Sequence, residues 1–217
     1  GNGQEDSGRV DPRMMAYVDT SLHAPYRVAL AGNPNAGKST IFNALTGERQ
    51  HTGNWPGKTV ARKEGEFAID GTPVHVIDLP GTYSLTAYSA EEIVTRDYLI
   101  HDQPDAVITV VDASNLERNL YLVVQMLELG LPLLVALNMT DIAATRGLNI
   151  DADRLAARLG VPVITTVATR SAGLDDLKHH LLHMIEHHAP GPIHRPPTSK
   201  SNGNQRADDR PLCPKCR

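Results

Sequence analysis

The chain has 217 residues, 41% of them hydrophobic, and a formal net charge of −4 at pH 7. That length and hydrophobic content fit one globular domain plus tails. The mild negative charge and the scarcity of aromatic residues, 4% of the chain, exclude a basic or stacking surface for nucleic acid, so we expect no nucleic-acid partner. No apolar run approaches the length of a membrane span.

The two ends of the chain differ in composition from its middle. Residues 1–24 begin polar and glycine-rich, and we expect a flexible arm there. Residues 190–217 are rich in Pro, Ser, Asn and Arg, so we expect a disordered tail, which holds Cys213 and Cys216 in a C-x-x-C pair. Such a pair is half of a zinc site, and two free thiols are the simpler interpretation. The domain itself is predicted over residues 25–189.

A buried strand over residues 27–31 is the first predicted element, and a phosphate-binding loop follows it. The loop matches G-x-x-x-x-G-K-[ST] with Gly32, Asn33, Pro34, Asn35, Ala36, Gly37, Lys38 and Ser39. A helix is predicted from Thr40, which is also an expected nucleotide contact. In such a loop the backbone N–H groups cradle the phosphates, Lys38 neutralises the β- and γ-oxygens, and the Ser39 hydroxyl ligates Mg²⁺. The sequence therefore predicts a nucleoside-triphosphate site.

A β-hairpin is predicted next, because two strands flank Asp70-Gly71. One strand therefore runs antiparallel in an otherwise parallel sheet. Asp78 ends the second of these strands, where a carboxylate can hold Mg²⁺ through water, and the Gly81 N–H can contact the γ-phosphate. A turn-forming role for Asp78 before Pro-Gly is the alternative.

The remaining elements alternate between strands and helices, which is typical of a parallel sheet covered on both faces. We predict a P-loop GTPase (Ras-like) α/β fold of three layers, with a mostly parallel six-stranded sheet and one antiparallel strand. Further strands are expected at 106–111, 131–137 and 161–166, and helices at 90–101, 116–129, 151–159 and 174–188.

Two later motifs predict that the nucleotide carries guanine. Asn138-Met139-Thr140-Asp141 is an N-x-x-D motif, whose carboxylate accepts hydrogen bonds from N1–H and the exocyclic amine of guanine; adenine would leave it unpaired. Thr140 stands where Lys is usual. Val167-Ala168-Thr169 lies where a backbone N–H meets guanine O6. Helix capping by Asn138 and Asp141 is the alternative for each residue alone, but the order of all the motifs favours GTP over ATP.

The segment from Gly53 to Thr59, G-N-W-P-G-K-T, together with GNPNAGKST, DLPGTYSL and NMTDIA, resembles the GTPase domain of the FeoB family of bacterial ferrous iron transporters. The resemblance covers roughly residues 26–188. It implies a switch domain that binds GTP and GDP with Mg²⁺, hydrolyses GTP and regulates ferrous iron uptake. It also implies a place at the cytoplasmic face of the inner membrane. The transporter's membrane portion, in the same chain or a separate one, is the expected partner, and a homo-oligomer stays open.

The resemblance further assigns roles to single residues. Thr59 matches the switch-I threonine that ligates Mg²⁺ together with Ser39. Asn35 matches an asparagine that coordinates K⁺ beside the phosphates, and backbone carbonyls around Gly53 and Trp55 complete that site. K⁺ there offsets the charge that develops as the γ-phosphoryl group leaves. The expected catalytic set is Asn35, Lys38, Thr59 and Gly81. No Gln follows Gly81 to orient water, so slow hydrolysis is expected.

Two other functions fit parts of the sequence. A ribosome- or RNA-associated GTPase of the Era/TrmE kind shares the N-P-N-x-G-K-S loop and the use of K⁺, but the Gly53–Thr59 segment fits FeoB better. A GTP-dependent adaptor would bind the nucleotide without needing hydrolysis. Separately, His179, His183 and His187 recur every four residues along one helix. A solvated helix face is the expected role, and chelation of Zn²⁺ or Fe²⁺ is the alternative.

Overall fold

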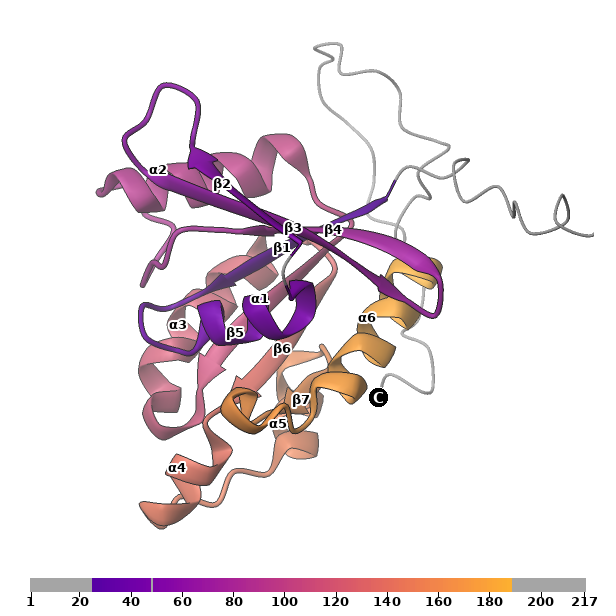
Figure 1. Ribbon diagram of the computed structural model, residues 1–217. Helices are drawn as coiled ribbons and strands as arrows, with labels where there is room; N and C mark the ends of the chain where they lie inside the picture. Colours follow the sequence, from indigo (N-terminus) through magenta and orange to yellow (C-terminus); the bar gives the residue numbers. More distant parts are fainter. Residues whose placement is uncertain (1–24, 48, 189–217) are drawn as a thin grey trace, which may run out of the picture.

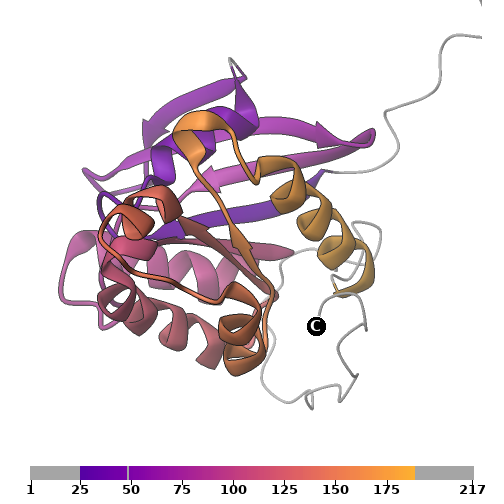
Figure 2. The ribbon, with the colours of Figure 1, turned by 90° about the horizontal axis from the view of Figure 1, so that it is seen from below.

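The computed structural model describes residues 25–47 and 49–188. The expectations for the arm at 1–24 and for the tail with Cys213 and Cys216 lie outside these residues. The described residues form three layers, a seven-stranded sheet between two layers of helices (Figures 1 and 2). The predicted three-layer α/β fold is therefore confirmed, with a sheet one strand wider than expected.

The sheet has the strand order β2-β3-β4-β1-β5-β6-β7. The strands are β1 (Tyr26–Gly32), β2 (Gln50–Asn54), β3 (Ala61–Ile69), β4 (Thr72–Asp78), β5 (Ala106–Asp112), β6 (Leu133–Asn138) and β7 (Val163–Thr165). Strand β3 pairs antiparallel with both β2 and β4, and all other pairs are parallel. One strand thus runs against the rest, as predicted. The strand that the sequence did not predict is β2, whose Q-H-T-G-N sequence has no apolar alternation and which is exposed over most of its length.

Helices connect most of the strands. They are α1 (Lys38–Thr46), α2 (Ala90–Asp97), α3 (Leu116–Glu128), α4 (Thr140–Thr145), α5 (Ala152–Leu159) and α6 (Leu174–His188), with a π-helical turn η2 (Tyr98–Asp102) and 3-10 turns η3 (Ala113–Asn115) and η4 (Ala168–Arg170). The predicted helix over 90–101 corresponds to α2 continued by η2. Among the described helices, none has the length and apolar character that a membrane crossing needs.

The two faces of the sheet carry two hydrophobic cores. Successive side chains of a strand point to opposite faces, and in β1 Val28 and Leu30 join one core while Ala29 and Ala31 join the other. Helices α1 and α6 cover the first face, and α2, α3 and α5 cover the second (Figures 1 and 2). The four β1 residues from Val28 to Ala31 are fully buried. β1 is therefore a fixed central strand from which the phosphate loop extends.

The carboxyl ends of the parallel strands lead into the predicted motifs. β1 runs into the phosphate loop, β4 ends at Asp78, β6 ends at Asn138, and Thr166 follows β7. Parallel strands end at the same edge of a sheet, where α/β proteins bind their ligands. The fold therefore gathers at one edge motifs that are far apart in the sequence, from the phosphate loop beginning at Gly32 to the loop that holds Val167.

Candidate nucleotide-binding site

The phosphate loop turns sharply into α1 at Gly37. This residue has φ 88°, the left-handed conformation that glycine adopts without strain. A Cβ atom at Gly37 would collide with the side-chain amide of Asn138. The conformation and the close approach both require glycine here.

The start of α1 is suited to an anion. The helix has no side-chain hydrogen bond at its cap and no acidic residue in its first turn, so no side chain competes with a phosphate for the N–H groups at its start. Nearby, the buried side-chain amide of Asn33 has no hydrogen-bond partner among the described residues. Ser39 and Thr40, the next two residues predicted to contact the nucleotide, lie on the same turn, and both are exposed. The donors at this helix end thus fit a phosphate group.

Lys38 and Asp78 form an ion pair across the site. Asp78 lies beside Leu30 at the end of β4, so the sheet register brings it to the phosphate loop. The two side chains are only 11% and 8% exposed. A nearly buried lysine and aspartate are stable here because each neutralises the other. The two charges also suit a magnesium–phosphate group, because the Lys38 ammonium attracts the phosphate and the Asp78 carboxylate attracts the metal ion.

Asn138 ties three loops together. Its Nδ2 donates to the Ala36 carbonyl of the phosphate loop at 3.0 Å, and its Oδ1 accepts from the Thr166 hydroxyl at 3.2 Å and from the Ala168 N–H at 3.0 Å. The side chain is 2% exposed. Asn138 therefore fixes the loop after β7 relative to the phosphate loop. In this structure the Ala168 N–H, in the loop predicted to offer a backbone N–H to guanine O6, donates to Asn138.

The carboxylate of Asp141 lies in the first turn of α4 and is 31% exposed. Its Oδ1 accepts from the Ile142 N–H at 2.9 Å, and its Oδ2 lies 3.7 Å from the Arg170 guanidinium. Met139 precedes it with φ 61°, and the Thr140 hydroxyl donates to the Thr166 carbonyl at 3.4 Å. Thr140 thus links α4 to the β7 loop, and Asp141 keeps acceptor capacity on the solvent side. Val167 is half-buried and Thr169 exposed in that loop.

The switch-I residues lie apart from the phosphate loop. Gly53 is exposed in β2, and Thr59 is exposed in the β2–β3 connection. In Figure 1 this connection projects beside α2, whereas the phosphate loop lies where β1 meets α1. Asn35, at the phosphate loop, is exposed and has φ 67°. The structure thus joins Lys38 to Asp78 but does not bring the predicted Mg²⁺ and K⁺ ligands of switch I to them.

Trp55 anchors this connection to the second core. Its ring meets that of Tyr98 edge to face, and the Arg62 guanidinium lies 4.9 Å from its centroid. Its backbone is used as well: its N–H donates to Val60 and its carbonyl accepts from the Lys58 N–H, at 2.9 and 3.0 Å. The buried indole N–H has no hydrogen-bond partner among the described residues. The sequence did not predict that this side chain is buried.

The segment that follows β4, at Gly81 and Thr82, packs against the phosphate loop. The Thr82 N–H donates to the Gly32 carbonyl at 3.2 Å. A Cβ atom at Gly81 would lie 3.3 Å from Pro34, so the two loops approach closely through a glycine. This places the Gly81 backbone beside the loop that was predicted to hold the phosphates.

Glu92 organises the rest of this segment. Its carboxylate accepts from the Ser84 hydroxyl at 2.7 Å and from the Tyr88 N–H at 2.9 Å, and it forms a capping box with Ser89. The hydrogen bond from Ser84, followed by that from Tyr88, lowers the pKa of Glu92 below its ordinary 4.5. Sequence reasoning missed Glu92, although S-x-x-E at residues 89–92 is a capping-box signal.

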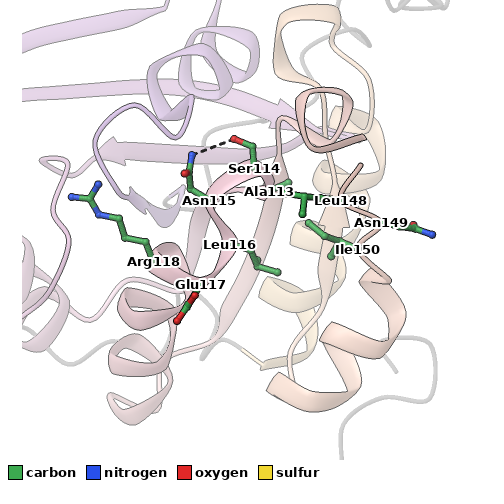
Figure 3. Close-up of a pocket in the computed structure, with 9 residues that line it drawn as sticks. All are labelled: Ala113, Ser114, Asn115, Leu116, Glu117, Arg118, Leu148, Asn149 and Ile150. Carbon is green, nitrogen blue, oxygen red and sulfur yellow. Dashed lines mark hydrogen bonds between the residues drawn. The ribbon is translucent and has the colours of Figure 1, made fainter. Parts of the chain in front are cut away.

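A separate hollow of about 450 Å³ lies between η3 and residues 148–150 (Figure 3). Ser114 and Asn115 line it, joined by a 3.2 Å hydrogen bond. None of the motif residues named above lines this hollow, so it is distinct from the predicted phosphate site.

A phosphate loop between β1 and α1, an aspartate at the end of β4 and an N-x-x-D motif after β6, on this strand order, define a GTPase-type P-loop domain. Comparison with known proteins narrows the class. The sequence matches the family of ferrous iron transport protein B over residues 26–181, and the chain belongs to that family.

Relatives support the assignment. The Fe(2+) transporter FeoB of Escherichia coli (strain K12) is 54% identical over 155 residues, which are 70% of this chain and 20% of the transporter. The chain thus spans about a fifth of the length of the curated relatives that it matches. Among solved structures, the FeoB G-domain from Methanococcus jannaschii is 49% identical with a TM-score of 0.67, covering 75% of this chain and 98% of that one. The cytosolic domain of T. maritima FeoB in a GDP form is 42% identical with a TM-score of 0.74, covering 77% and 66%.

Proposed function

We propose that this chain is a GTP-binding switch that hydrolyses GTP slowly with Mg²⁺ and K⁺ and thereby regulates ferrous iron uptake. The observation that carries the proposal is the Lys38–Asp78 ion pair at the uncapped start of α1. Both side chains are nearly buried. The Asp78 carboxylate gives Lys38 the negative charge that a phosphate would supply, and the Lys38 ammonium gives Asp78 the positive charge that a metal ion would supply. When nucleotide enters, Lys38 exchanges Asp78 for the β- and γ-oxygens.

Guanine selectivity is assigned to Asp141 and the β7 loop. Among the described residues, the partner of Asp141 Oδ2 is the exposed guanidinium of Arg170 at 3.7 Å, which holds it weakly. Guanine offers that carboxylate two N–H donors, and adenine offers none in that arrangement. Relatives solved with GDP, such as a mutant of S. thermophilus NFeoB, support the choice of guanine. Asn138, Met139, Val167, Ala168 and Thr169 would frame the base.

Mg²⁺ fits the residues at the phosphate end of the site. Ser39 and Thr59 would supply hydroxyl oxygens and Asp78 a carboxylate, which are the hard oxygen ligands that this ion prefers. Bound Mg²⁺ would neutralise charge on the transferring phosphoryl group. For Thr59 to reach the Mg²⁺ site, the β2–β3 connection has to move away from α2.

K⁺ is assigned to Asn35 and to backbone carbonyls at Gly53 and Trp55. Asn35 is exposed at the phosphate loop, so its amide oxygen is available. The Trp55 carbonyl accepts a hydrogen bond from Lys58 and would have to be released. Ordering of the switch loop by a cation, only when nucleotide is present, would couple binding to conformation.

The role in iron uptake rests on the family. The E. coli relative is an Fe(2+) transporter, and this chain corresponds to a fifth of it. We therefore assign the regulatory switch to this chain, at the cytoplasmic face of a membrane, and transport to a membrane portion in the same or another polypeptide. An Era/TrmE-like RNA-associated GTPase and a non-hydrolysing adaptor are the competing functions.

The test is GTP hydrolysis by the chain in KCl and in NaCl at equal ionic strength. We expect faster hydrolysis in KCl, and loss of that stimulation in Asn35→Ala without a matching loss of GDP affinity. Asn43→Ala, an exposed asparagine in α1, is the matched control and should keep the stimulation. Equal rates in both salts for the unmodified chain would refute the K⁺ assignment. Nucleotide binding without any hydrolysis would favour the adaptor.

A further inference from the structure

The outer face of α6 carries two histidine rings in contact. His183 and His187 are four residues apart, so they lie on the same face of the helix, one turn from each other. Their ring centroids are 4.4 Å apart, and the ring planes are inclined by 46°. His183 is partly buried and His187 is exposed, so solvent reaches the pair. Two imidazoles held this closely can turn their ring nitrogens toward one shared ion.

The backbone beneath the pair is held firmly by the core. The opposite face of α6 is buried against the sheet and α1. Its buried side chains are Leu174, Leu177, Leu181, Met184 and Ile185. The helix therefore does not have to form when an ion binds, and only two side-chain orientations need to be fixed. That ordering cost is small compared with the cost of folding a loop around a metal.

From this geometry we infer that His183 and His187 form a two-ligand chelate for a divalent transition-metal ion such as Zn²⁺, Ni²⁺ or Fe²⁺. Neutral imidazole is a ligand for these borderline ions and a poor one for Mg²⁺ or Ca²⁺. Among the described residues, no group of three or more His, Cys, Asp or Glu side chains is placed to hold a metal. Within that part of the chain the two rings are therefore the whole protein contribution, and water fills the other coordination positions.

This site is separate from the predicted nucleotide site. Helix α6 starts beside η4 near the guanine motif and runs away from it (Figure 1). At a rise of about 1.5 Å per residue, His183 and His187 lie roughly 14 and 20 Å along the axis from Leu174. A metal bound there leaves the Lys38–Asp78 pair untouched, so metal binding and nucleotide binding are measurable independently.

The test is a Zn²⁺ titration of the full chain, followed by NMR of the ¹⁵N-labelled histidine rings. Millimolar Mg²⁺ and GDP are kept present to fill hard-oxygen sites, and Cys213→Ser with Cys216→Ser removes competing thiolates. We expect the ring signals of His183 and His187 to shift together. His183→Gln and His187→Gln should each weaken Zn²⁺ binding at least about tenfold, and the double variant should be little weaker than either, because one change already destroys the chelate.

His51→Gln is the matched control, since His51 is an exposed histidine in β2, and it should leave Zn²⁺ affinity unchanged. His187 is exposed, so the melting temperature without metal should stay the same in His187→Gln and in the control. Unchanged affinity in both α6 variants would overturn the inference. A loss with His179→Gln and His183→Gln but not with His187→Gln would also overturn it, by assigning chelation to the other pair one turn earlier.

Discussion

The indole ring of Trp55 meets the phenol ring of Tyr98 edge to face, with 5.5 Å between their centroids and 68° between their planes. This contact joins switch I to the π-helical turn that extends α2. π-helical turns are rare in proteins, and those that occur often lie at functional sites. The proposed K⁺ site needs the Trp55 carbonyl near Asn35, so closing of the switch competes with burial of the indole. The nucleotide has to bind the closed form more tightly to shift this balance.

Trp55 fluorescence should report that competition directly, because the chain has one tryptophan. Adding a non-hydrolysable GTP analogue with Mg²⁺ and K⁺ should move the emission to longer wavelength and increase quenching by acrylamide, as the ring leaves its buried position. GDP should change both signals less. Identical spectra with and without the analogue, at saturating binding, would mean that the indole stays packed on Tyr98 in both states.

Gly37→Ala should lower both stability and nucleotide affinity. The new methyl group would need the left-handed conformation and would collide with the Asn138 amide that links the phosphate loop to the β7 loop. Gly160→Ala is the control, because Gly160 has a similar backbone, φ 73° and ψ 17°, with no heavy atom within 4 Å of its Cβ position.

The control should cost about 1–2 kcal/mol, the cost of the left-handed conformation alone. Gly37→Ala should cost more than that in urea unfolding and should weaken binding of GDP in calorimetry. Equal unfolding costs for the two variants, with GDP binding intact, would show that the Asn138 contact is not needed.

Asp141→Asn should change which base the site accepts. Loss of the charged acceptor should weaken GTP binding by about 3 kcal/mol, or roughly 100-fold. The amide that replaces it can donate to the 2-oxo group of xanthine, so XTP should bind the variant better than GTP does. Competition of GTP and XTP against a fluorescent nucleotide measures both effects. An unchanged preference for GTP would remove Asp141 from base recognition.

The Glu92 network should give the domain a pH-dependent contribution to stability. Hydrogen bonds hold the folded-state pKa of this carboxyl below 4.5. They therefore stabilise the fold above about pH 4.5, and this contribution is lost as the pH falls through the lower folded-state value. Glu92→Gln should lower the melting temperature at pH 7, and the difference from the unmodified chain should shrink below pH 4.5.

Glu91→Gln is the control for Glu92, since Glu91 is an exposed neighbour in the same first turn of α2. It removes the same charge near the helix start and keeps the capping box. A melting temperature lowered equally by both variants would assign the effect to the helix dipole instead of to the hydrogen bonds around Ser84 and Tyr88.

Local patterns were enough to predict the parts of the fold and site that depend on neighbouring residues. The turn at Gly37, the strand-ending Asp78 and the hairpin at Asp70-Gly71 all lie where the sequence indicated. The three-layer fold followed from the alternation of strands and helices. Such motifs are set by backbone conformation over a few residues, and no long-range contact is needed to recognise them.

Features that depend on distant contacts were not predictable in the same way. β2 is polar, and it becomes a strand only because β3 offers it a partner. The burial of Trp55 depends on Tyr98, and the role of Glu92 depends on how residues 84–88 fold back over the start of α2. The three-residue β7 is shorter than the apolar run around it, because pairing with β6, and not composition, sets its length.

Strand β2 is one of the two edge strands of the sheet, and its side chains are almost all exposed to water. Detaching it from β3 would break backbone hydrogen bonds that water can replace, and none of its own side chains belongs to either hydrophobic core. Trp55, the next residue, is the side chain that a larger movement would uncover. The pairing of β2 with β3 can therefore be lost or regained at the edge while the central strands stay paired. A protein built this way can move one edge strand during ligand exchange while its buried central strands keep their packing.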